Sequence, residues 1–237
     1  MNWINQLLAI LVMKLVWNYL RLKKKDSNQL QFKQNKMINY NKNGPFVEGV
    51  SLEDIAKDQS TPFYVYSQTK ITNTFEQLKN ILNFEIFYAV KANSNQSIIK
   101  LMASLGAGAD VVSIGELERA ILAGVEPQKI IFEGIGKTKQ DIAFALEKNI
   151  RLINIESIDE LERVNEVGLN QNKKINIGIR LNPHIDGQTL DKISTGKKTD
   201  KFGIDTDKLN ELFQVLEVSK NVNLIGISCH VGSQIFN

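Results

Sequence analysis

The segment "FYAVKANSN", residues 87–95, ends an apolar run with a lysine and then changes at once to small and amide residues. It is followed by "SIIKLMASLG" (97–106), whose apolar residues have the spacing of an amphipathic helix. A second apolar run, Ala109–Val112, comes directly after that segment. A strand, a polar turn, a helix and another strand in this order predict a β/α unit with parallel strands.

The same unit recurs along the chain from Thr61 onward. The predicted strands are Phe84–Val90, Ala109–Val112, Ile130–Phe132, Arg151–Ile155, Ile175–Leu181 and Leu224–Val231. The segments between them, such as "GELERAILAG" and "SIDELERVNEVG", have helical spacing, and several end in Gly or Asn as a helix C-cap does. This alternation predicts an α/β fold, and the order of elements alone fits either a (β/α) barrel or a doubly wound sheet.

Polar residues at the strand ends favour the barrel. They lie within or just after all six predicted strands, namely Lys91, Asp110, Glu133, Glu156, Arg180 and His230. A barrel mouth gathers side chains from many strands, whereas a doubly wound sheet binds ligands mostly at one switch point. We therefore predict a (β/α)8 TIM-type barrel, which is incomplete here because about six units are in view.

The rest of the chain divides by composition. Residues 61–237 form the predicted partial barrel, and 37–60 are a strand and helix piece that we assign to the start of a second, β-rich domain. The apolar part of residues 1–36 is interrupted by Lys14 and several amides, so it falls short of a membrane-spanning helix. We interpret 1–36 as extraneous sequence upstream of Met37, with a membrane-proximal amphipathic helix as the alternative.

Composition excludes several classes of function. Residues 1–36 hold 7 of the 29 Lys and Arg residues but only 1 of the 26 Asp and Glu residues, so the remainder is slightly acidic, and no basic stripe typical of nucleic-acid binding is visible in it. The single cysteine, Cys229, excludes an internal disulfide, and with two histidines no zinc-binding cluster can form. We expect no metal, no nucleic-acid partner and no membrane association, and a cytoplasmic location.

Lys91 is the first candidate for chemistry. A lysine at a strand end often reaches into solvent along its own aliphatic stem. Here small residues follow and a turn carries the lysine to the barrel mouth, where burial would lower its pKa and supply the free amine that a Schiff base requires. The alternative, a solvated lysine without function, remains open at this point.

Three other motifs resemble functional sites. "GIGKT" (134–138) fails as a phosphate-binding loop because Ile131 stands where that motif needs glycine, and "GAGADV" (106–111) precedes a strand instead of following one. Cys229 and His230 are neighbours on a predicted strand and point to opposite faces, so they cannot form a catalytic pair. We expect Cys229 to face the surrounding helices and His230 the interior, followed by "HVGSQ" (230–234), whose composition could bind a phosphate.

Six motifs in register now point to a family. "YAVKAN" (88–93), "GAGADVVSIGE" (106–116), "FEGIGKT" (132–138), "INIES" (153–157), "ISTGKKTDKFGI" (193–204) and "HVGSQ" (230–234) occur in this order. Together they resemble the diaminopimelate decarboxylases, pyridoxal-phosphate enzymes of the alanine-racemase-like barrel class. The resemblance runs from about residue 60 to the last residue.

The resemblance implies roles for particular residues. Lys91 would be the covalent attachment point of pyridoxal 5'-phosphate and later a proton donor, and His230 would stack on the cofactor ring. Gly232 and Ser233 would hold the phosphate. Asp110 and Arg180 match polar positions around the cofactor. The implied reaction is decarboxylation of meso-2,6-diaminopimelate to L-lysine and CO2, in a homodimer that binds a small amino-acid substrate.

The family's other functional parts are not found in this sequence. They are the acidic partner of the pyridine nitrogen, a glycine-rich phosphate segment and a Cys-Glu-Ser segment from a partner subunit. We therefore expect the chain as given to be a truncated and inactive form. Alternatives are a decarboxylase of ornithine, arginine or carboxynorspermidine, a pyridoxal-phosphate carrier without turnover, and a barrel without cofactor.

The segment "DGQTLDKISTGKKTDKFGI" (186–204) is too long for an ordinary connection between a strand and a helix. It holds Lys197, Lys198 and Lys201 among small residues. This composition predicts a lid that attracts a dicarboxylate and excludes water, with a solvated surface loop as the alternative.

Overall fold

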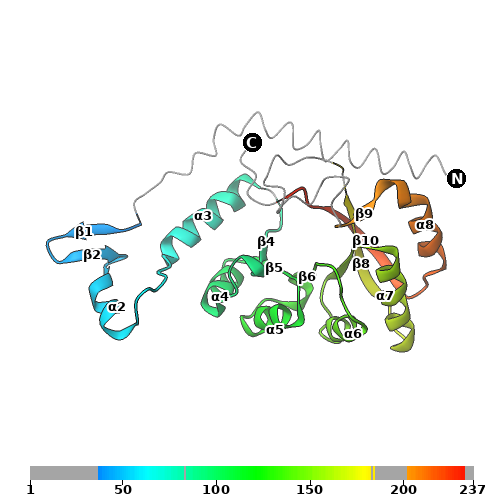
Figure 1. Ribbon diagram of the computed structural model, residues 1–237, viewed down its shortest axis with the longest axis horizontal. Coiled ribbons are helices and arrows are strands. Elements are labelled where there is room, and N and C mark those ends of the chain that lie inside the picture. The colour runs from blue at the N-terminus through cyan, green and yellow to red at the C-terminus, as the bar shows by residue number, and fades with distance from the viewer. Residues whose placement is uncertain (1–36, 83, 183, 185–201, 233–237) are drawn as a thin grey trace. The chain divides into compact units, whose positions relative to one another are not determined.

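The computed structural model describes residues 37–82, 84–182, 184 and 202–232 (Figure 1). These residues form two compact units, which divide between Ile81 and Leu82. The segment 1–36, predicted to be extraneous or membrane-proximal, lies outside the described residues. The domain boundary predicted at residues 60 and 61 stays a prediction.

The first unit contains a small antiparallel sheet and two helices. Its strands are β1 (Asn39–Asn41), β2 (Gly44–Val47) and β3 (Val50–Ser51), and its helices are α2 (Leu52–Asp58) and α3 (Gln68–Ile81). Ser51 caps α2, because its Oγ accepts a hydrogen bond from Asp54 N at 3.2 Å. Glu48 links the sheet to α3 through a hydrogen bond from Thr69 N at 2.7 Å.

The second unit is built on a parallel sheet. Its strands are β4 (Phe87–Ala89), β5 (Gly108–Val111), β6 (Ile130–Phe132), β7 (Leu152–Ile155), β8 (Ile175–Asn182) and β10 (Val222–Cys229), and a short β9 (Ile204–Asp205) pairs with β8. All six predicted strands are confirmed to within a few residues at their ends. The prediction missed β9.

The strand order distinguishes the two candidate topologies. In the sheet the order is β4, β5, β6, β7, β8 and β10, so each strand lies beside the one that precedes it along this series. Every adjacent pair in the series is parallel. A doubly wound sheet reverses direction at a switch point, and this order does not. The structure confirms the prediction of β/α units wound in one direction, as in a TIM-type barrel.

Helices follow the strands and lie on the outer side of the sheet (Figure 1). They are α4 (Gln96–Ser104), α5 (Ile114–Leu122), α6 (Lys139–Glu147), α7 (Ile158–Asn170) and α8 (Leu209–Val218), with single 3-10 turns η2 (Val90–Ala92), η3 (Pro127–Lys129) and η5 (Thr206–Lys208). A polar residue caps four of the starts: Asn95, Ser113, Thr138 and Ser157 each accept a hydrogen bond from a backbone N–H in the first turn. These caps fix where each loop ends and each helix begins.

The core of this unit lies between the sheet and the helices. Its largest fully buried side chains include Phe132 on β6, Ile153 on β7 and Ile177 on β8. All four residues of β7 are buried, as expected for a central strand of a parallel sheet. The buried strands therefore form a packed scaffold that places the residues at their carboxyl ends.

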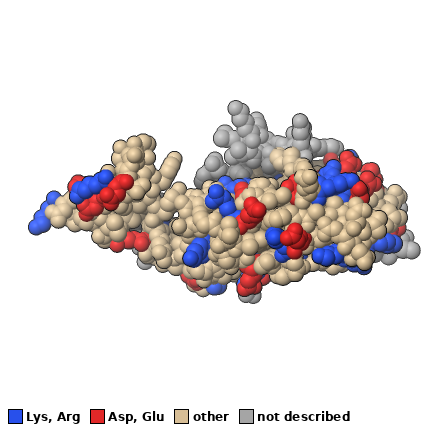
Figure 2. Space-filling view, turned by 90° about the horizontal axis from the view of Figure 1, so that it is seen from below, with Lys and Arg blue, Asp and Glu red and all other residues tan. Residues whose placement is uncertain are grey.

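No helix among the described residues is long and apolar enough to cross a lipid bilayer. Figure 2 shows Lys and Arg side chains interspersed with Asp and Glu side chains over the described surface of the face in view.

Candidate functional site

Six polar side chains come from the carboxyl ends of six parallel strands. Asp110 lies in β5 and Arg180 in β8, whereas the others lie one or two residues after β4, β6, β7 and β10; these are Lys91, Glu133, Glu156 and His230. Because all these strands are parallel, their carboxyl ends lie at the same edge of the sheet. We call these six residues the mouth cluster. The structure thus brings together every polar residue on which the barrel prediction depended.

Lys91 differs from its prediction in one respect. The strand ends at Ala89, and Lys91 lies in the 3-10 turn η2, where its side chain is exposed. The expected burial of Lys91 is therefore wrong in this structure. The reason is local: the chain leaves the sheet one residue earlier than the apolar run suggests, and Val90 alone turns back into the core. The amine is still carried at the mouth, because the turn follows β4 without a break.

Asp110 faces the opposite side of β5 from its neighbours Ala109 and Val111, which are buried in the core. Its Oδ1 atom is buried and has no hydrogen-bond partner among the described residues. Burial, followed by the negative charge of Glu133, raises the pKa of Asp110 from 3.8 to about 6, although Lys91 acts in the opposite direction. A buried carboxyl oxygen normally accepts a hydrogen bond, and the described residues supply no donor to this one. Asp110 could therefore accept a hydrogen bond from a bound molecule.

Glu156 and Arg180 form a buried ion pair within the mouth cluster. Arg180 Nη1 donates to both carboxylate oxygens of Glu156, at 3.0 and 3.1 Å. The Glu156 side chain is 2% exposed and the Arg180 side chain 11%. The Arg180 guanidinium also lies 5.3 Å from the centre of the Phe202 ring. These contacts leave Arg180 little freedom, so its charge is held at a fixed place.

His230 follows β10 and is partly buried. Burial lowers its pKa below the usual 6.5, and the positive charges of Arg180 and Lys91 lower it further. At neutral pH the imidazole is therefore uncharged, which suits a ring that packs against another ring. Gly232 has a φ of 144°, a conformation that favours glycine. Ser233, the other predicted phosphate contact, lies outside the described residues.

Sequence reasoning placed Glu133 and Glu156 at the strand ends but gave them no role, and it did not assign Asn154 or Ser228 to the site. Asn154 Nδ2 donates a short hydrogen bond to the Glu133 carboxylate, and burial raises the pKa of Glu133. Ser228 Oγ is buried and, among the described residues, has no hydrogen-bond partner. The signal for Glu156 was present, because an acidic residue directly after a fully buried strand needs a counter-charge. Nothing in the sequence indicated which cation that would be.

The expected orientation of β10 is correct in part. Gly226 and Ser228 are less exposed than their neighbours, so the strand alternates as predicted. The prediction that the other face packs on helices is wrong, because Ile225 and Ile227 are 47% and 53% exposed and Cys229 is exposed too. The described helices leave this face of the edge strand open to solvent.

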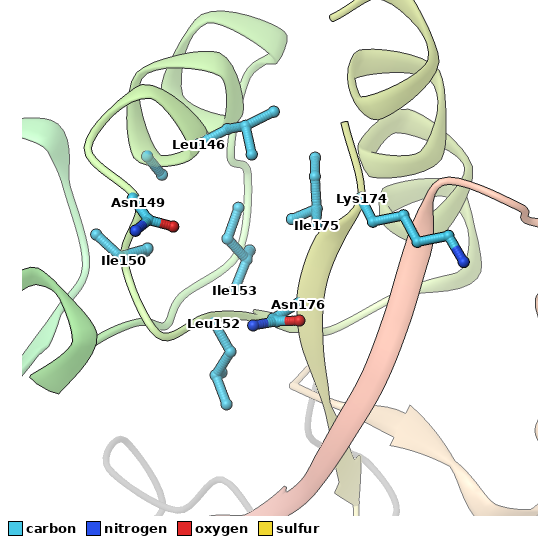
Figure 3. Close-up of a pocket in the computed structure, with 9 residues that line it drawn as sticks. Leu146, Asn149, Ile150, Leu152, Ile153, Lys174, Ile175 and Asn176 are labelled. Carbon is cyan, nitrogen blue, oxygen red and sulfur yellow. The ribbon is translucent and has the colours of Figure 1, made fainter. Parts of the chain in front are cut away.

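Two other features lie apart from the mouth. The pocket in Figure 3 is lined by the end of α6 and by the amino ends of β7 and β8, including Leu146, Leu152 and Ile175. It is therefore at the opposite end of the strands from the mouth cluster.

Most of the predicted lid, residues 185–201, lies outside the described residues. Among the described residues, no group of His, Cys, Asp and Glu side chains could hold a metal ion.

Comparison with known proteins yields consistent matches. Residues 68–237 match the family described as "Pyridoxal-dependent decarboxylase, pyridoxal binding domain". The chain is 40% identical over 204 residues to diaminopimelate decarboxylase of Aquifex aeolicus, covering 86% of this chain and 49% of that protein. It is 43% identical over 193 residues to the diaminopimelate decarboxylase of Neisseria meningitidis serogroup B, covering 80% of this chain and 47% of that protein.

A solved structure gives the same result. The crystal structure of diaminopimelate decarboxylase from Helicobacter pylori complexed with L-lysine superposes with a TM-score of 0.76 at 39% identity, covering 79% of this chain and 48% of that one. The chain spans about half the length of the curated relatives it matches.

Proposed function

Since this chain belongs to the family of pyridoxal-dependent decarboxylases, as their pyridoxal-binding domain, we propose that the full-length protein decarboxylates meso-2,6-diaminopimelate to L-lysine and CO2. Support for the substrate comes from the relatives, which are named as diaminopimelate decarboxylases at 40% and 43% identity. The observation that carries the proposal is the mouth cluster itself.

The residues present fit pyridoxal phosphate. Asp110 Oδ1 is a buried acceptor that has no donor among the described residues, and Ser228 Oγ is a second buried polar atom in the same condition. Lys91 offers an amine at the same edge of the sheet, and its charge acts on both Asp110 and His230. An aldehyde that also carries polar groups would use both the amine and the unpartnered oxygen.

In this proposal each residue has a distinct role. Lys91 Nζ would hold the cofactor and would later donate a proton at the substrate Cα. His230, uncharged at neutral pH, would lie against the cofactor ring. Gly232 and Ser233 hold the phosphate, while Asp110 and Arg180 bind polar groups around the ring. When bound, pyridoxal phosphate accepts the electron pair released as the bond between Cα and the carboxylate breaks.

The finer features of the proposal concern the whole protein. We propose that it works as a homodimer in the cytoplasm, as the family resemblance implies. The exposed apolar face of β10, with Leu224, Ile225 and Ile227, is compatible with further protein packing there.

The test is an activity assay of the full-length protein with pyridoxal phosphate. Release of CO2 and L-lysine from meso-diaminopimelate, lost in Lys91→Ala, is the expected result. Ornithine, arginine and carboxynorspermidine are assayed in parallel, because turnover of one of these instead would assign another decarboxylase. Binding of pyridoxal phosphate without turnover of any of the four would contradict the enzymatic proposal and assign a cofactor carrier.

A further inference from the structure

The lysine of "GIGKT", which fails as a phosphate-binding loop, lies in the interior of the protein. The Lys137 side chain is only 2% exposed. It is placed there by two glycines in left-handed conformations, Gly134 with φ 94° and Gly136 with φ 79°, which turn the loop after β6 inward. An ammonium group at this depth requires compensation for the water that it has lost.

Lys137 obtains that compensation from three acceptors. Its Nζ donates to Gly134 O in a short hydrogen bond, to Asn154 O at 2.7 Å and to Glu160 Oε1 at 2.8 Å. An ammonium has three N–H donors, so each of them is used. The acceptors come from the loop after β6, from β7 and from the start of α7. Lys137 therefore ties two neighbouring β/α units together at the mouth.

The contacts continue from Glu160 to the mouth cluster. Glu160, whose side chain is 4% exposed, uses its second oxygen to accept a hydrogen bond from Glu156 N at 2.8 Å. The Glu156 carboxylate in turn holds Arg180 Nη1 at 3.0 and 3.1 Å. A continuous series of hydrogen bonds thus leads from Lys137 to the Arg180 guanidinium, whose charge acts on Asp110 and His230.

Stability is a poor explanation for this arrangement. A buried ion pair loses the hydration of both ions, so a pair of apolar side chains of similar volume is often as stable or more stable. Its geometry offers something that apolar side chains cannot, namely a fixed acceptor for the Glu156 N–H. We propose that Lys137 is a positioning residue: through Glu160 it fixes the end of β7 so that Glu156 holds Arg180 at the site.

The chain provides a matched control two residues further on. Lys139 forms an ion pair with Glu166, but these side chains are 56% and 48% exposed. A surface pair of this kind contributes little and holds no other group in place. Lys139→Met therefore removes the same charge from the same region, without touching the series of hydrogen bonds.

The first test needs no cofactor. Amide hydrogen exchange is measured at Glu156 N–H in the 237-residue chain carrying Lys137→Met, or Lys137→Met with Glu160→Met, which removes both charges in case the single variant does not fold. In either variant we expect exchange at Glu156 about tenfold faster, with the amides of the buried strands unchanged. Compared with Lys137→Met with Glu160→Met, the variant Lys137→Met with Glu160→Gln keeps an acceptor oxygen for Glu156 N–H. It should therefore show slower exchange at Glu156 than the double methionine variant. Glu156 exchange at the wild-type rate in the folded variants would overturn the proposal.

The second test concerns the site, and this part rests on the proposed function. Pyridoxal-phosphate affinity is measured by absorbance titration under conditions in which every variant is folded. We expect Lys137→Met with Glu160→Met to weaken cofactor binding about tenfold and Lys139→Met to leave it unchanged. When Arg180→Lys is combined with the double methionine variant, the two losses of affinity should not add, because both act through the position of Arg180. Additive effects, or wild-type affinity despite fast Glu156 exchange, would show that Lys137 is merely structural. If the wild-type chain itself does not bind the cofactor, the proposed function fails, and the exchange rates still decide the link from Lys137 to Glu156.

Discussion

Asp110→Asn should make the protein more stable at neutral pH. The structure raises the pKa of Asp110 from 3.8 to about 6, first by burial and then by the charge of Glu133, so the ionised carboxylate is disfavoured in the fold. Above pH 6 the wild type must carry this charge, whereas the amide of the variant carries none. The shift corresponds to about 3 kcal/mol at most, and we expect a gain of about 1–3 kcal/mol in the free energy of unfolding at pH 7.5.

The raised pKa also determines how the stability difference between wild type and Asp110→Asn changes with pH. A carboxyl group whose pKa is higher in the folded state binds its proton more tightly there, so the wild type loses stability as pH rises from 3.8 to about 6. The variant lacks this loss. The difference between the two proteins should therefore be near zero at pH 3.8 and below, grow up to about pH 6, and then stay constant.

Urea unfolding of the 237-residue chain at a series of pH values measures this difference. Glu118→Gln, which neutralises an exposed carboxylate on the neighbouring helix α5, is the control and should change stability by no more than about 0.5 kcal/mol. A variant that is less stable than wild type at pH 7.5, or a difference that does not depend on pH, would refute the reasoning. The same substitution should weaken pyridoxal-phosphate binding, because a neutral amide oxygen is a weaker acceptor than the unpartnered carboxylate oxygen Oδ1.

Two further predictions follow from the geometry of the mouth. A methyl group at Gly178 would come within 1.9 Å of Asn154 Oδ1, so Gly178→Ala should displace the Asn154 amide that donates to Glu133. We expect this to lower the free energy of unfolding, measured in urea, by about 1–3 kcal/mol. Unchanged stability would contradict this packing. His230 should titrate with a midpoint below pH 6.5, because burial and nearby cations disfavour its charged form. NMR titration of the two histidines measures this midpoint, and the variant His184→Asn assigns the two signals. A midpoint at or above 6.5 would be inconsistent with the structure.

The sequence predicted the parts of the fold that are coded locally. The β/α units were found because each of the first five apolar runs is followed by a segment with helical spacing, and the structure adds a side-chain cap at several helix starts, as with Ser113 before α5 and Ser157 before α7. The prediction missed α3, whose sequence is polar overall and buries one residue, Phe75. It missed β9 because a strand of two residues exists only through its pairing with β8.

The mouth cluster could be predicted as a group but not in its contacts. Parallel strands bring their carboxyl ends together whatever the loops do, so residue types at those ends were enough to locate the site. The exposure of Lys91 was not predictable, because it depends on a turn that leaves the sheet after Ala89. The pairing of Lys137 with Glu160 was not predictable either. These residues are 23 positions apart in different β/α units, and only the packing of the fold brings them together.

The attachment of pyridoxal phosphate at Lys91 is the central claim, and one measurement tests it directly. The protein is incubated with pyridoxal phosphate, reduced with borohydride and digested, and the modified peptide is identified by mass spectrometry. We predict a single modified lysine, Lys91, and loss of the modification in Lys91→Arg. Modification of Lys137, Lys201 or another lysine with Lys91 left unmodified would contradict it.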